Sequence, residues 1–181
     1  MHRRRLLGVL GAGTMASLSG ERPAAAAQVP PLSVRIVPTS YREDGGRTIG
    51  LYQPSQHFYI VFTNASGKLI RLWKEWCSWG YDNLSFEVTD EAGRSVAVTK
   101  SQRDWNKNFP DWEAIPPGGH QVREINFDPT TWENSPMPEA GRSRAVRMRA
   151  IYDIRPEGLT KKHGIWTGQV SSPEESYELR K

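Results

Sequence analysis

The segment 83–89 constrains the fold of this chain more than any other feature of its sequence. It reads NLSFEVT, in which Leu84, Phe86 and Val88 alternate with polar residues. A period of two places these three apolar side chains on one face of a β-strand. A shift of one residue in the pairing of this strand would expose the whole apolar row to water, so the register is well specified.

A second alternating segment follows after a turn. Residues 90–93 read DEAG, which is typical of a hairpin turn, and Val96 and Val98 alternate with polar residues in 95–99. We therefore expect a β-hairpin over 83–99. In this hairpin Val96 and Val98 face the core together with the apolar row of the first strand.

The chain after residue 28 continues in the same way, with short apolar segments separated by turn-forming residues. Further strands are expected at 32–36, 57–63, 68–74, 121–127, 143–152, 165–170 and 176–179, and 48–52 is a candidate for a short edge strand. No segment repeats its apolar residues with the period of a helix over three turns. The sequence therefore predicts an all-β fold, an immunoglobulin-like Greek-key β-sandwich of about eight or nine strands.

Three details of this prediction concern particular segments. Residues 68–74 are expected to pair with 57–63 as a hairpin. Alternation breaks in 121–127, because Val122 falls on the opposite face from the other apolar residues, and this indicates a β-bulge. Residues 155–164, which carry several basic side chains, are expected to form a hairpin loop.

The first 27 residues are expected to be an export signal and not part of the fold. Three arginines at 3–5 precede a mildly apolar segment at 6–20, and the alanines at 24–27 offer a cleavage site of the A-x-A type. Paired arginines followed by two leucines favour the twin-arginine route slightly over the general secretory route. The mature chain, 28–181, is therefore predicted to be a single exported domain, either periplasmic or extracellular.

Loss of this signal changes the charge of the working protein. The whole chain has a formal net charge of +4, and its first 27 residues hold four arginines and one glutamate, which leaves +1 for the mature chain. Nucleic-acid binding needs a concentrated basic face, and no long run of lysine and arginine remains, so we expect no nucleic-acid partner. The mature chain has no apolar run of about 18 residues, so no transmembrane segment is predicted.

Three short motifs resemble those of a known fold family. The chain reads FTNASG at 62–67, FEVTDEAGR at 86–94 and IPPG at 115–118. In this order they are similar to the turns of secreted bacterial immunoglobulin-like sandwich domains, and of the intracellular proteinase inhibitor family called BsuPI. The chain differs from that inhibitor family in its export signal and in the tryptophan-rich segment before residue 86. The resemblance therefore implies the fold and not the activity.

Motifs of catalysis and cofactor binding are not found in the mature sequence. The segment GAGTMA at 11–16 matches a dinucleotide-binding fingerprint, but it lies inside the export signal and not between a strand and a helix. No G-x-S-x-G or S-x-x-K motif occurs. His57, His120 and His163 are far apart in sequence and distant from Cys77, which is not typical of a metal site. We predict that the protein is not an enzyme and has no catalytic residues, cofactor or metal.

The single cysteine, Cys77, cannot form a disulfide within the chain. The simplest interpretation is a small buried residue that packs like an apolar one. The alternative is a free thiol that pairs with another chain. The fold is in either case expected to depend on its apolar core.

Aromatic residues in two segments, 75–82 and 100–113, are the best candidates for binding. Exposed aromatic side chains stack on sugar rings or anchor protein interfaces, because they desolvate a large rigid area at a small cost in entropy. The predicted binding surface consists of Trp76, Trp79, Tyr81, Trp105, Phe109 and Trp112. The alternative is that tryptophans fill the ends of the sandwich, and this is favoured for Trp73 and Trp79.

The leading functional hypothesis is a non-catalytic binding or structural module of the cell envelope. Its partner would be an unknown protein or an envelope polysaccharide, bound by the segments 75–82, 100–113 and 155–164 if they meet at one end. Basic residues in the last segment could attract an acidic polymer. One alternative is a proteinase inhibitor that presents an exposed loop such as 128–141. Another is a carbohydrate-binding domain that uses exposed tryptophans.

Overall fold

The computed structural model describes residues 30–50, 57–106 and 108–181, and this part of the chain has an all-β fold. Strands account for 48% of it and helices for 7%. The predicted export signal at 1–27 lies outside the described residues, as do positions 51 and 52 of the strand expected at 48–52.

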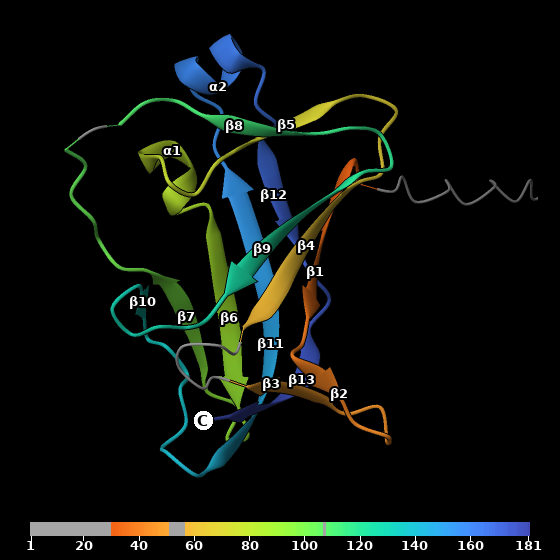
Figure 1. The fold of residues 1–181 in the computed structure, drawn as a ribbon, viewed down its shortest axis with the longest axis vertical. Coiled ribbons are helices and arrows are strands. Elements are labelled where there is room, and N and C mark those ends of the chain that lie inside the picture. The colour runs from red at the N-terminus through yellow and green to blue at the C-terminus, as the bar shows by residue number, and fades with distance from the viewer. Residues whose placement is uncertain (1–29, 51–56, 107) are drawn as a thin grey trace, which may run out of the picture.

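Three antiparallel strands form the smaller of two sheets that pack on each other (Figure 1). Their order is β1 (Leu32–Val37), β4 (Phe58–Asn64) and β9 (His120–Ile125). Phe58, Ile60 and Phe62 are fully buried on one face of the central strand, as their alternation predicts.

The larger sheet has seven strands in its main path and one beside it. The path runs through β10 (Trp132–Glu133), β7 (Ser95–Lys100), β6 (Leu84–Asp90), β11 (Ser143–Ile154), β13 (Glu175–Arg180), β3 (Arg47–Gly50) and β2 (Ser40–Tyr41). Strand β12 (Gly168–Ser171) pairs with the end of β11. All pairs are antiparallel except β13 with β3. The strands outnumber the eight or nine expected, because segments as short as two residues also pair.

The core lies between the inner faces of the two sheets. Phe58 of the smaller sheet meets Phe86 of the larger one edge to face, with ring centroids 5.7 Å apart. Phe62 and Tyr152 make a second such contact at 4.7 Å. Each fully buried side chain of this size contributes roughly 1.5–3 kcal/mol through loss of apolar surface from water.

The hairpin predicted over 83–99 is confirmed, with Phe86 opposite Val98 and Val88 opposite Val96. Val98 is fully buried, but the prediction for Val96 is wrong, because that side chain is exposed. The neighbouring strand β10 covers only the far end of β7, at positions 99 and 100. Val96 therefore lies on the part of β7 that forms the edge of the sheet in the described ranges, and its side chain is exposed there.

Residues 68–74 do not pair with β4, so that part of the prediction is wrong. Strand β5 (Ile70–Trp73) pairs instead with β8 (Trp112–Ile115) in a separate two-stranded sheet. Both edges of β4 are already occupied by β1 and β9. The side chain of Asn64 holds these segments at the end of β4, because its amide group donates to the carbonyl oxygens of Lys68 at 2.7 Å and Ile115 at 2.8 Å.

Strand β9 contains no bulge, contrary to the prediction. Its pairing with β4 continues without interruption along the whole strand. The apolar pattern breaks because Gln121 and Arg123 occupy two of the inward positions, while Val122 points to solvent. Only 6% of Arg123 is exposed. Its guanidinium lies 5.1 Å from the ring centroids of both Phe62 and Tyr152.

Two short helices interrupt the strands, α1 (Ser78–Tyr81) and α2 (Gly158–His163). The connection expected at 155–164 does lie between two paired antiparallel strands, β11 and β12, but it contains helix α2. Glu157 and Thr160 form a capping box at its start, and Gly164 ends it in the left-handed conformation, with φ 63°. Neither helix of the described ranges has the length and apolar character needed to cross a membrane. Figure 1 shows α1, α2, β5 and β8 gathered at one end of the sandwich, opposite β2 and β3.

Candidate functional site

Two loops are bound to each other at the α1 end of the sandwich. The backbone N–H of Lys74 donates to the carbonyl of Asp111 at 3.0 Å, and its ammonium group pairs with the carboxylate at 2.9 Å. The backbone N–H of Ser78 donates to Asn108 Oδ1 at 3.0 Å, and the Asn108 amide group donates back to the Ser78 hydroxyl. These bonds therefore fix the loop before α1 and the loop before β8 relative to each other.

The Lys74–Asp111 pair also changes the acidity of both groups. The hydrogen bond from the ammonium group lowers the pKa of the Asp111 carboxyl below its usual value. The same bond raises the pKa of Lys74. Both groups stay charged at neutral pH, so the contact between the two loops includes an ion pair.

Cys77 and Gly80 allow α1 to lie close to the contact between the two loops. The Cys77 thiol is buried and lies 3.2 Å from the carbonyl oxygen of Lys74, to which it donates, so the prediction of a small buried residue is confirmed. A Cβ atom at Gly80 would overlap the same carbonyl group. The helix can approach this closely only because residue 80 is glycine.

Two of the six predicted binding residues are well exposed, Trp76 at 55% and Phe109 at 69%. Each is the sequence neighbour of a residue in the contact between the loops, Cys77 and Asn108 respectively. The Lys74 ammonium lies 5.8 Å from the centroid of the Trp76 ring. Two large apolar side chains are thus presented to solvent by loops that are held together.

Trp79 and Trp112 are half-buried and both pack on the fully buried Trp73, with ring centroids 6.1 Å and 6.3 Å away. Trp112 lies in β8 and not in the predicted loop. Its ring centroid is 4.8 Å from that of His163 in α2, and the Arg71 guanidinium lies 5.7 Å from it. Trp112 therefore joins α2 to the two-stranded sheet, and the segments 75–82, 100–113 and 155–164 do meet at one end.

Tyr81 is buried, so its assignment to an exposed surface is wrong. Its ring packs edge to face on Trp105 at 5.5 Å, and the Lys100 ammonium lies 5.3 Å from it. Trp105 is half-buried, and the Arg103 guanidinium lies 5.1 Å from its ring. Tyr81 therefore supports the Trp105 ring and exposes little of its own surface.

A cavity of about 550 Å³ lies beside α1, on the outer face of the larger sheet. Its floor consists of side chains from four strands, namely Ser85, Thr99, Ile151, Asp153 and Gln169. Pairing of Ser85 with Ile151 and of Asp153 with Gln169 brings these residues together. Trp79, Asp82, Arg155 and Glu157 also line this cavity.

A second cavity of about 380 Å³ shares the lining residue Asp82 with the first. It is lined by Tyr81, Asp82, Gln102, Arg103, Asp104 and Trp105. We call the two cavities together the α1 groove. Partial burial raises the pKa of the Asp82 carboxyl, and the positive charge of Lys100 opposes that rise.

Polar residues of the groove floor were not predicted as a site. They come from two hairpins that lie far apart in sequence, β6 with β7 and β11 with β12, and each is an ordinary outward position of a strand. The only signal in the sequence is polarity at alternate positions, and every exposed face of a sheet shows that signal.

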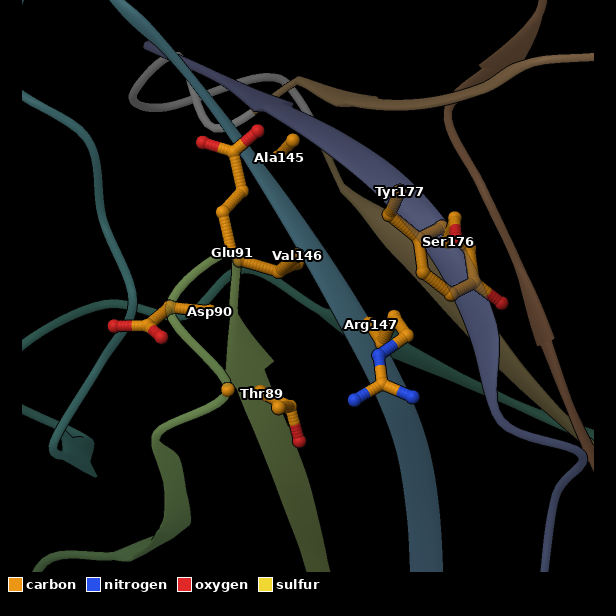
Figure 2. Close-up of a pocket in the computed structure, with 9 residues that line it drawn as sticks. Thr89, Asp90, Glu91, Ala145, Val146, Arg147, Ser176 and Tyr177 are labelled. Atoms are coloured by element: carbon orange, nitrogen blue, oxygen red, sulfur yellow. The ribbon is translucent and has the colours of Figure 1, made fainter.

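A third cavity of about 430 Å³ opens on the larger sheet around Thr89, Arg147 and Tyr177 (Figure 2). Figure 2 shows the carboxylates of Asp90 and Glu91 directed away from the Arg147 guanidinium. Asp90 is bound instead to Arg94 at 2.8 Å, and Arg147 to Glu174 at 3.4 Å. Asp90 and Arg147 are therefore already engaged, and the charged groups of this cavity do not converge on a common point.

Among the described residues, no group of three or more His, Cys, Asp or Glu side chains is arranged to hold a metal ion. No protein-family model, curated protein or solved structure in the comparisons matches this chain. The geometry of the α1 end is therefore the basis for the function proposed below.

Proposed function

We propose that the chain is an exported, non-catalytic binding module of the cell envelope, built on an immunoglobulin-like Greek-key sandwich. Its contact surface is the α1 end, and its target is an insoluble component of the envelope. The observation that carries this proposal is the exposure of Trp76 and Phe109. Each of them is next in sequence to a residue of the contact that binds the two loops together. The packing of two sheets on each other also supports the proposed sandwich fold.

Energetics favour a binding role for these two side chains. Large aromatic residues that become fully buried at an interface are typical binding hot spots, and their truncation costs about 2 kcal/mol or more. That free energy corresponds to roughly a 30-fold change in the dissociation constant. Because hydrogen bonds already fix both loops, little conformational entropy remains to be lost on binding.

The alternative of a proteinase inhibitor finds less support. The segment proposed to enter a protease, 128–141, is anchored along its length. Strand β10 pairs with β7, and Trp132 is buried. Ser135 donates to the carbonyl of Phe127 at 2.7 Å, and Asn134 donates to that of Ala97 at 3.0 Å. This segment would have to leave the sandwich before it could reach a protease active site.

Co-sedimentation with cell walls of the producing organism tests the proposal. The exported protein should sediment with the walls, and Trp76→Ala combined with Phe109→Ala should weaken binding about 30-fold or more, as the loss of one hot spot already predicts. Tyr41→Ala is a matched control, because Tyr41 is a similarly exposed aromatic residue in β2 at the opposite end. Equal sedimentation of the double variant and the wild type would refute the proposal.

A further inference from the structure

We infer that the α1 groove binds a neutral glycan chain, with Trp79 and Trp105 as stacking platforms in its two halves. This inference rests on the proposed binding function and names the class of its ligand. It concerns a different part of the α1 end from the exposed Trp76 and Phe109.

Each half of the groove contains one partly exposed tryptophan held in place by another aromatic residue. Trp79 packs on Trp73 with an angle of 38° between the rings, and Trp105 packs on Tyr81 with an angle of 78°. Packing on a buried ring restricts the rotamers of both indoles before any ligand arrives. Rigid aromatic faces suit the apolar faces of pyranose rings, because stacking then loses little side-chain entropy.

Polar groups that surround these platforms are free to contact a ligand. Asp153 and Gln169 on the floor, and Asp82 between the two cavities, make no side-chain hydrogen bond or ion pair with any residue that the structure describes. The nearby hydroxyls of Ser85 and Thr99 likewise make no hydrogen bond with any residue that the structure describes. An apolar platform ringed by unengaged carboxylate, amide and hydroxyl groups matches a sugar, which offers C–H groups on its faces and hydroxyls at its edge.

The charged side chains of the groove favour neutral glycans over acidic ones. The larger cavity has three carboxylates, from Asp82, Asp153 and Glu157, against the single guanidinium of Arg155. The smaller cavity adds one charge of each sign, from Asp104 and Arg103. The groove is therefore net negative, and it would repel a uronic-acid or phosphate-bearing polymer. This excludes the acidic polymer considered from the basic residues of 155–164 as a ligand of the groove.

Size and shape favour a chain over a single small molecule. Both cavities, of about 550 Å³ and 380 Å³, fall within the usual range for ligand sites, and they share the lining residue Asp82. A monosaccharide could use only one of the two platforms. An extended oligosaccharide that crosses Asp82 can contact both.

Isothermal titration calorimetry on the whole exported protein tests this inference. The probes are hexasaccharides of β-1,4-glucose, β-1,4-N-acetylglucosamine, β-1,3-glucose and β-1,4-mannose, with hexagalacturonate as the anionic comparison. At least one neutral probe should bind, and the galacturonate probe should bind at least 10-fold more weakly. No binding of any neutral probe at millimolar concentration, or tighter binding of galacturonate, would overturn the inference.

Variants then locate the site. Trp105→Ala should weaken binding of the neutral probe at least 10-fold, and so should Trp79→Ala. Because Trp79 contributes to packing, Asp153→Ala combined with Gln169→Ala provides a second test on side chains of the groove floor, with an expected loss of at least 5-fold. Tyr41→Ala should bind like the wild type. Unchanged binding in Trp105→Ala and in the floor variant would overturn the inference even if the protein sediments with cell walls.

Discussion

Asn64 is the residue whose substitution tests the architecture of the α1 end most directly. Its side chain is fully buried and makes four hydrogen bonds. It donates to the carbonyl oxygens of Lys68 and Ile115, and it accepts from the backbone N–H and the hydroxyl of Ser66. These bonds connect the end of β4 with strand β8 and with the segment that leads into β5. Asn64→Ala removes all four.

The expected destabilisation follows from where each bond lies. The bond to Ile115 is in the interior, so its loss leaves a buried carbonyl without a partner, which costs about 1–3 kcal/mol. The other three bonds are partly solvated and contribute about 0.5–1 kcal/mol each. We therefore expect Asn64→Ala to lower the free energy of unfolding by about 4 kcal/mol, a large share of the roughly 5–15 kcal/mol of a typical domain.

Urea denaturation monitored by tryptophan fluorescence measures this change. With a slope of about 2 kcal/mol per molar urea, the midpoint should fall by about 2 M. Ser66→Ala is the matched control, because it removes only one of the four Asn64 bonds, that from the Ser66 hydroxyl, together with two exposed bonds between this hydroxyl and the backbone of Lys68. Exposed hydrogen bonds contribute little, so we expect a loss of about 1 kcal/mol. If Asn64→Ala destabilised no more than Ser66→Ala, the assignment of Asn64 as the link between the sheets would be wrong.

Three further predictions concern the contact between the loops. Because the ammonium of Lys74 lowers the folded-state pKa of Asp111, the stability from this pair is present above the unfolded pKa of about 3.9 and is lost as the pH falls through the lower folded value. The difference in urea midpoint between wild type and Asp111→Asn should therefore shrink below about pH 4. Cys77 should react with a thiol reagent only at the rate of unfolding, because it is buried, and rapid labelling of the native protein would contradict its described position. Gly80→Ala should displace α1, since the new methyl group would overlap a backbone carbonyl, and it should weaken glycan binding in calorimetry while Gly67→Ala, at an open position, should not.

Alternation within single segments was predictable because it depends only on local geometry. The inward rows of β4, β6 and β11 are buried as their period of two requires, for example Phe86 and Tyr152. In β9 the same rule holds, but Arg123 occupies an inward position, and a polar residue there hides the period from any pattern of apolar residues.

Strand partners and the candidate site were less predictable, because they depend on contacts between distant segments. Residues 68–74 and 57–63 are adjacent in sequence, yet the edges of β4 are occupied by strands from elsewhere in the chain. Exposure of Trp76 and burial of Tyr81, only five residues away, depend on how the Ser78–Asn108 hydrogen bonds place the two loops. Helix α2, with six residues, is too short for its periodicity to be seen.

The inward position of Arg123 has a consequence for solubility. Strand β9 pairs only with β4 among the described strands, so its other edge has no strand partner in that part of the chain. An edge of this kind can recruit strands of other molecules and start aggregation, and inward-pointing charged residues are one means by which natural proteins prevent this. A foreign strand added at this edge would remove the remaining contact of the Arg123 guanidinium with water, and full desolvation of a charged group is costly. Arg123→Leu should therefore leave a monomer that aggregates faster than the wild type in light-scattering measurements, and equal aggregation rates would argue against this protective role.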